Sequence, residues 1–109
     1  MEVFDYQKII DQLREENKSG TDQYLPCDTF TVDVRIGNGV HTPREHICSQ
    51  DEFTFVMKGE VEMYVDGTTT LLHAGQGLLV KAGVRHKTNY KPDAEWLLIS
   101  KPHKHHYFE

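Results

Sequence analysis

The stretch His46-Ile-Cys-Ser-Gln-Asp-Glu-Phe-Thr-Phe-Val-Met-Lys-Gly59 decides both the fold and the chemistry of this chain. An imidazole, a thiol and a carboxylate, those of His46, Cys48 and Glu52, fall within seven residues, directly before an alternating apolar run that a glycine ends. Side chains two apart in an extended strand point to the same side, so His46 and Cys48 can face one space. With His86 as a downstream partner, the stretch predicts a metal site on a β-scaffold.

Short apolar stretches separated by turn residues continue on both sides of this segment. Residues 29–36 alternate strictly, with Phe30 on the apolar face, which predicts a half-buried strand. The Asp66-Gly67 pair is the strongest hairpin turn of the chain. We expect further strands at residues 52–57, 61–65, 68–73, 78–81, 86–90 and 95–100, the last buried on both faces, and a bent strand or cavity-lining loop at 40–50. Without helices between them, the strands predict an antiparallel sandwich or barrel.

The two ends of the chain differ from this pattern. Residues 3–18 have an apolar stripe at helical spacing, with Asp5 as a cap and Gly20 as a stop, and predict a helix. The stripe is suited to packing on the body of the domain or on a second subunit; a regulatory or partner-binding helix is the alternative. Residues 101–109 are polar, carry His103, His105 and His106, and are expected to lie outside the barrel. The predicted division is 1–20 helix, 27–102 barrel and 103–109 tail.

Length and composition exclude several classes of protein. A chain of 109 residues is one domain. Its net charge of −5 and pI near 5.8 argue against a general binder of nucleic acid or anionic membranes. Cys27 and Cys48 are the only cysteines, and neither a signal-like nor a transmembrane-length apolar run is found, so we expect a cytoplasmic protein without a disulfide framework.

The spacing around His46 resembles the first motif of the cupin superfamily, in particular of small single-domain cupins. In that family the motif reads Gly, five residues, His-x-His, three or four residues, Glu, six residues, Gly. The corresponding residues here are Gly39, His46, Cys48, Glu52 and Gly59. The first interval is one residue longer than in the family, and Cys48 stands where the family usually has its second histidine.

A second resemblance lies downstream. The second cupin motif reads Gly, five residues, Pro-x-Gly, two residues, His, three residues, Asn. The corresponding residues are Gly75, Lys81 in place of the proline, Gly83, His86 and, one place early, Asn89. The resemblance extends over about residues 32–100. It implies an antiparallel jelly-roll β-barrel with a short N-terminal helix, and commonly a homodimer, for which the 96–99 stretch with Phe53, Phe55 and Met57 offers apolar material.

The resemblance also implies a divalent transition metal, which is iron, manganese, nickel, zinc or copper. The predicted ligands are His46, Cys48, Glu52 and His86. A thiolate at Cys48 favours zinc or copper over manganese, whereas the remaining two-histidine, one-carboxylate set is typical of non-haem iron(II) oxygen chemistry. His41 is a substitute ligand if the loop before His46 bulges.

Three functions are compatible with the sequence. The first is a metal-binding cupin acting on a small molecule, as an iron-type oxygenase or an isomerase. The second is a non-catalytic module that binds or senses a small ligand, with a degenerate metal site, and the third is a structural or regulatory dimer. Tyr90 and Trp96 can line a pocket or pack in the core, and Arg44 and Arg85 can recognise an anionic substrate or lie on the surface. The sequence names no substrate.

Overall fold

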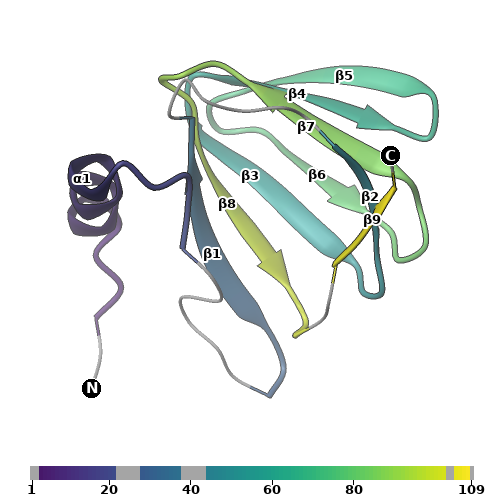
Figure 1. Cartoon of the computed structure of the whole chain (residues 1–109), viewed down its shortest axis with the longest axis horizontal. Coiled ribbons are helices and arrows are strands. Elements are labelled where there is room, and N and C mark those ends of the chain that lie inside the picture. The colour runs from purple at the N-terminus through teal and green to yellow at the C-terminus, as the bar shows by residue number, and fades with distance from the viewer. Residues whose placement is uncertain (1–2, 22–27, 38–43, 103–104, 109) are drawn as a thin grey trace.

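The computed structural model describes residues 3–21, 28–37, 44–102 and 105–108. In that part of the chain, one helix accompanies nine strands in two antiparallel sheets that face each other (Figure 1). The elements are α1 (Tyr6–Glu16), β1 (Thr31–Ile36), β2 (Glu45–Cys48), β3 (Glu52–Lys58), β4 (Glu60–Val65), β5 (Thr68–His73), β6 (Gly77–Val80), β7 (His86–Tyr90), β8 (Glu95–Ser100) and β9 (His105–Phe108).

The strand order is that of an antiparallel jelly roll, which confirms the predicted fold class. One sheet has the order β1-β8-β3-β6, and the other has the order β5-β4-β7-β2-β9. The β4–β5 hairpin turns at Asp66 and Gly67, whose φ angles are both positive, at 47° and 85°. Such a two-residue turn matches the twist of the paired strands and sets their register. Of the expected 40–50 segment, residues 45–48 form β2, and residues 40–43 lie outside the described part.

A hydrophobic core fills the space between the sheets. Because paired residues of an antiparallel ladder share a face, the register decides which side chains point inward. The buried members come from both sheets: Val56, Val80 and Trp96 from one, and Val61, Met63 and Leu72 from the other, with Ala94 beside them. Tyr90 packs against this cluster and lies 4.4 Å from Trp96 between ring centroids, so both aromatic residues serve in the core.

Strand β1 differs from the half-buried strand that its alternation predicts. It begins at Thr31 and leaves Phe30 46% exposed, while Thr31 and Asp33, on its polar face, are buried. The reason is that both faces are covered, the apolar one by α1 and the polar one by the opposite sheet. The prediction that β8 is buried on both faces was also too strong, because its residues 97–99 are only half-buried.

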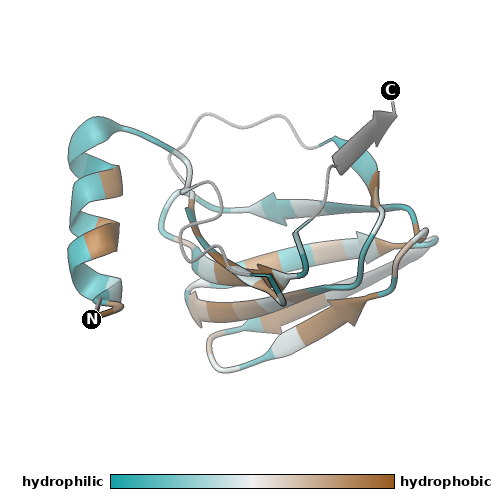
Figure 2. Ribbon diagram, turned by 90° about the horizontal axis from the view of Figure 1, so that it is seen from below, coloured by the Kyte–Doolittle hydropathy of each residue, from teal (hydrophilic) through white to brown (hydrophobic). Residues whose placement is uncertain are grey.

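Helix α1 lies against the outer face of the β1-β8-β3-β6 sheet (Figures 1 and 2). Asp5 caps it as predicted, its carboxylate accepting from the Lys8 amide at 3.1 Å. The helix ends at Glu16, with Asn17 in the left-handed conformation, rather than near Gly20. Its buried residues, Ile9, Ile10 and Leu13, pack on Val34 and Ile36 of β1.

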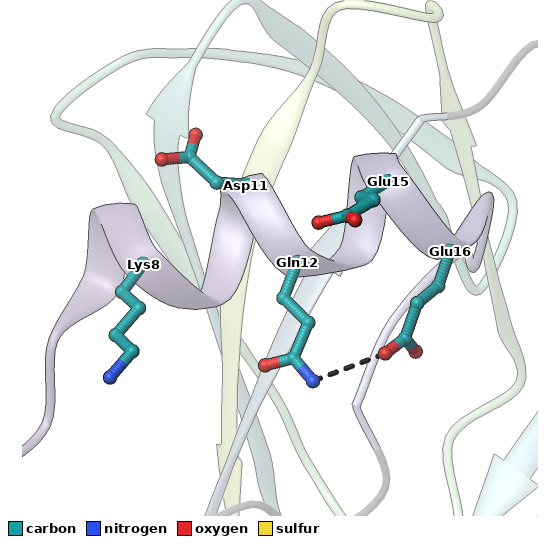
Figure 3. Close-up of a pocket in the computed structure, with 5 residues that line it drawn as sticks. All are labelled: Lys8, Asp11, Gln12, Glu15 and Glu16. Atoms are coloured by element: carbon teal, nitrogen blue, oxygen red, sulfur yellow. Dashed lines mark hydrogen bonds between the residues drawn. The ribbon is translucent and has the colours of Figure 1, made fainter.

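The polar side of α1 borders a hollow on the surface (Figure 3). Its lining side chains are Lys8, Asp11, Gln12, Glu15 and Glu16. Gln12 donates to the Glu16 carboxylate at 3.1 Å, and none of these residues belongs to the predicted metal set. The hollow therefore belongs to the solvated face of an amphipathic helix.

The C-terminal residues depart from the expectation of a tail outside the barrel. The backbone of β9 pairs with β2, and the register sets His105 opposite Cys48 and His106 opposite Ile47. An edge strand leaves backbone donors and acceptors unpaired, and a following extended segment satisfies them whatever its polarity. No helix in the described part is long and apolar enough to cross a membrane.

Candidate metal centre

The structure brings the four predicted ligand residues together. One potential ligand atom from each of His46, Cys48, Glu52 and His86 lies within 4.8 Å of all the others. His46 and Cys48 lie on β2, Glu52 opens β3 and His86 opens β7. Residues from three strands and both sheets thus converge on one point at the end of the sandwich.

Local backbone contacts explain why the strand ends meet there. β2 pairs with β7 through His46 and His86, whose ring centroids are 4.1 Å apart. The Gly83 amide donates to the Cys48 carbonyl at 3.0 Å, which joins the turn before β7 to the end of β2. The Ala82 amide donates to the Asp51 carboxylate at 2.9 Å. Asp51, which we did not single out from the sequence, therefore connects the segment between β2 and β3 to the turn before β7.

The centre is shielded from water. Glu52, His86 and Cys48 are 3%, 1% and 2% exposed, and His46 is half-buried. Ionisable groups this deeply buried cost free energy unless they are paired or bind a metal. The burial of three of the four side chains therefore indicates a built site rather than a chance cluster on the surface.

The hydrogen bonds of His86 define its tautomer. Its Nδ1 lies 3.2 Å from the Val84 carbonyl, an acceptor only, so Nδ1 carries the proton. Nε2 is then an acceptor; it is buried and has no hydrogen-bond partner in the described chain. It faces the Glu52 Oε1 at 3.4 Å, so in the neutral imidazole two lone pairs oppose each other, whereas an imidazolium forms an ion pair there. A cation between these atoms satisfies both.

His46 is oriented in the same way. Its Nδ1 lies 3.2 Å from the Arg44 carbonyl, and a hydrogen bond donated by Nδ1 to this carbonyl leaves Nε2 as the ligating atom. Backbone acceptors of this kind are typical second partners of metal-binding histidines. A backbone carbonyl at Nδ1 thus helps to orient each of the two rings.

Cys48 completes the set as a protonated thiol. Its Sγ donates to the Glu52 Oε2 at 3.3 Å. Burial, followed by the adjacent Glu52 carboxylate, raises the pKa of the Cys48 thiol well above its usual range. A bound divalent cation reverses this balance, because it replaces the proton and neutralises the charge of both groups. Two imidazole nitrogens, a sulfur and a carboxylate oxygen suit first-row divalent metals.

The other residues that the sequence brought forward lie apart from the centre or outside the described part. His41 and Cys27 lie outside it. Arg44 is exposed, and Arg85 forms an ion pair with Glu45 at 3.5 Å on the surface. Asn89, the last residue of the second motif, donates to Glu62 at 3.2 Å on an exposed face rather than toward the metal set.

Comparison with known proteins agrees with this geometry. The family model of the cupin domain matches residues 32–100, and the chain belongs to this family. A structure of an uncharacterised conserved protein with a double-stranded β-helix domain from Klebsiella pneumoniae has a TM-score of 0.76, at 20% identity, over 100% of this chain and 98% of its own. A mutant of the salicylate 1,2-dioxygenase from Pseudoaminobacter salicylatoxidans has a TM-score of 0.75, at 20% identity, over 92% of this chain and 34% of its own.

One curated relative is similar in sequence. It is the polyketide synthase CurC of Streptomyces cyaneus, which is 26% identical over 102 residues, covering 84% of this chain. The chain spans 66% of the length of that relative, slightly less than two thirds. These similarities establish the cupin fold. The chemistry has to be inferred from the residues of the site.

Proposed function

We propose that this chain is a metal-dependent cupin that acts on a small molecule, with the metal held by His46, Cys48, Glu52 and His86. The observation that carries the proposal is the buried Nε2 of His86, which has no hydrogen-bond partner among the described residues and faces the Glu52 carboxylate at 3.4 Å. A polar atom left without a partner in the interior costs about 1–3 kcal/mol. A cation between the two atoms satisfies both of them.

We propose zinc, copper or iron(II) as the metal, because a thiolate ligand disfavours manganese. Bound there, the metal supplies Lewis-acid polarisation or, as iron, oxygen activation. The likeness to a dioxygenase supports oxygenation at the level of the fold alone. Ligation by Cys48 needs a reduced thiol, which favours the cytoplasm or another reducing compartment.

Elemental analysis of the untagged full chain, purified without a nickel column, tests the proposal. We expect about one transition metal per chain, and its loss in His86→Ala. His73→Ala is the matched control, because His73 is exposed on β5 and makes its ion pair with Glu60 at 3.6 Å. Full occupancy in the His86 variant, or no uptake by the wild type after anaerobic incubation with iron, zinc or copper, would contradict the site.

A non-catalytic binding or sensing module is the second candidate. The near-complete burial of Cys48, Glu52 and His86 favours it, because a closed centre leaves few metal positions open to a substrate. The metal-loaded protein then consumes no oxygen with any small molecule that raises its melting temperature. Turnover of such a ligand would exclude this candidate.

We also propose that two copies associate through the outer face of the β1-β8-β3-β6 sheet. There Phe53 pairs with Leu79 and with Ile99, and α1 covers only the part of the face nearer Val34. Leu79 is 48% exposed. Light scattering at micromolar concentration is expected to show a dimer that Leu79→Glu separates. Leu71→Glu, on the other sheet and also 48% exposed, is expected to leave the dimer intact, and a monomeric wild type would reject the interface.

A further inference from the structure

Strand β9 pairs with the strand that carries two of the four metal-site residues. In its sheet, β2 lies between β7 on one side and β9, the edge strand, on the other (Figure 1). The β2–β9 register sets His105 directly opposite Cys48. The C-terminal strand is therefore the element that borders the metal centre on the side away from β7.

The register also decides which residues of β9 belong to the face of the centre. Directly opposed residues of an antiparallel ladder share a face, and successive residues of a strand alternate between faces. His46 and Cys48 each supply a potential ligand atom to the centre, so their common face is the one on which the metal would lie. His105 belongs to this face, whereas its neighbour His106, opposite Ile47, belongs to the other.

The pairing on the other side of β2 shows that a cross-strand histidine already serves this centre. His86 lies opposite His46 in the β2–β7 ladder, and one potential ligand atom from each belongs to the cluster. His105 has the same relation to Cys48 in the β2–β9 ladder. Each of the two β2 residues is thus opposed by a histidine, one from each flanking strand.

The spacing of the ladder suits a shared metal. Opposed residues of an antiparallel pair have their Cβ atoms about 4.5–5.5 Å apart. Metal–sulfur and metal–nitrogen bonds are about 2.3 and 2.1 Å long. One cation can therefore bind the Cys48 sulfur and an imidazole from position 105 with the register unchanged.

The centre is also most open along β2. Cys48, Glu52 and His86 are almost fully buried, whereas His46 is only half-buried. Solvent therefore reaches the centre beside the strand that β9 borders. Four donors complete a tetrahedral site, and a first-row divalent metal accepts a fifth ligand from an open side.

We propose that His105 is a further ligand of the metal held by His46, Cys48, Glu52 and His86, so that β9 closes the centre when metal binds. The inference rests on the proposed metal-dependent function. His105 lies outside residues 32–100, which the family model matches, so the family resemblance does not supply this ligand. By linkage, the metal stabilises the pairing of β9 on β2 by as much as the paired strand strengthens metal binding.

Zinc titration of the full chain against a competing chelator tests the assignment. We expect His105→Ala to weaken zinc binding about tenfold or more, since loss of even an outer-shell partner of a metal has an effect of that size. The melting temperature of the chelator-treated protein is expected to stay unchanged, because the residue acts through the metal. His106→Ala is the matched control: it removes the adjacent histidine, which lies on the other face, and is expected to keep the wild-type zinc affinity.

Cobalt(II) substitution separates ligation from a purely structural role. The visible absorption of cobalt(II) is weaker with five ligands than with four, so His105→Ala is expected to intensify it, and His106→Ala to leave it unchanged. His105→Cys keeps a ligand at this position and is expected to retain most of the zinc affinity.

The outcomes distinguish this inference from the proposed function. Wild-type zinc affinity and an unchanged cobalt spectrum in His105→Ala overturn the role of His105 and leave the four-residue centre standing. Equal losses in the His105 and His106 variants also overturn it, because the effect then follows the strand rather than the face. Metal that stays in His86→Ala but is lost when both terminal histidines are removed is adventitious and overturns both proposals, as does a wild type that takes up no metal.

Discussion

Two buried carboxylates, Glu52 and Glu95, stand in opposite hydrogen-bonding situations. Glu95, which is 6% exposed, lies where α1 meets the outer sheet face. The Tyr6 hydroxyl donates to one of its oxygens at 2.6 Å, and Arg14 approaches the other at 3.5 Å. Glu52, which is 3% exposed, accepts from the Cys48 thiol but faces the lone pair of His86 Nε2.

The difference distinguishes the ionic cluster that joins α1 to the sheet from the proposed metal site. At Glu95 each carboxylate oxygen meets a donor, and the group connects the helix to the sandwich. At Glu52 the neighbours include the Cys48 thiol, which donates, and the His86 Nε2 at 3.4 Å, an arrangement that a bound cation would complete. Buried charge is thus a weak indicator of function, and an acceptor that faces another acceptor is a stronger one. Three substitutions test this contrast.

The substitution Glu52→Gln has the largest expected effect and acts in opposite directions with and without metal. Its amide can donate to His86 Nε2, so the metal-free protein gains about 1 kcal/mol of stability. The same change removes the anionic ligand, and with it the stabilisation by zinc, about 4 kcal/mol at a thousandfold excess over Kd. Denaturant unfolding with zinc and with a chelator measures both effects.

The control for this test is Glu60→Gln, since Glu60 is partly exposed and pairs with the exposed His73. We expect it to change neither quantity by more than about 0.5 kcal/mol. A metal-free Glu52→Gln protein that is clearly less stable than the wild type would show that the carboxylate has a structural role like that of Glu95.

The substitution Glu95→Ala has the next largest effect, and it is independent of metal. It leaves the Tyr6 hydroxyl and the Arg14 guanidinium without their partner at the helix interface, which costs about 2 kcal/mol. Chemical denaturation measures the loss, and zinc titration is expected to give the wild-type affinity. Reduced zinc affinity at unchanged stability would contradict the division of roles between the two carboxylates.

The sequence reveals the four clustered residues of the candidate metal site better than it reveals the inner face of β1. Residues two apart on a strand, such as His46 and Cys48, share a side whatever the rest of the fold does, and the resemblance to the two cupin motifs added Glu52 and His86 to the predicted set. Alternation in β1 correctly separated Arg35 from Val34, but it does not show which face a helix covers. The polar side was therefore assigned to solvent, although it points into the sandwich.

Long-range pairing was also hidden in the sequence. β9 follows a polar stretch, and it pairs with β2 through backbone groups, whose partner the side-chain pattern does not identify. Phe30 looked like a core residue because it continues the apolar alternation, yet it is 46% exposed, one residue before β1 begins. Local pattern thus specified strand faces and turns, whereas coverage of each face depends on tertiary packing.

The smallest expected effect is that of Tyr6→Phe, and its pH dependence extends the comparison. Burial and the hydrogen bond to Glu95 raise the pKa of Tyr6 well above its usual value of about 10. A group whose pKa is raised on folding stabilises the protein fully below the unfolded-state pKa, and that contribution declines as the pH rises through the folded-state value. We therefore expect the wild type to exceed Tyr6→Phe by about 1 kcal/mol from pH 7 to 9. Urea unfolding above pH 10 is expected to show this gap narrowing, and a gap that widens there would mean that the folded protein stabilises the phenolate, so that folding lowers the pKa of Tyr6.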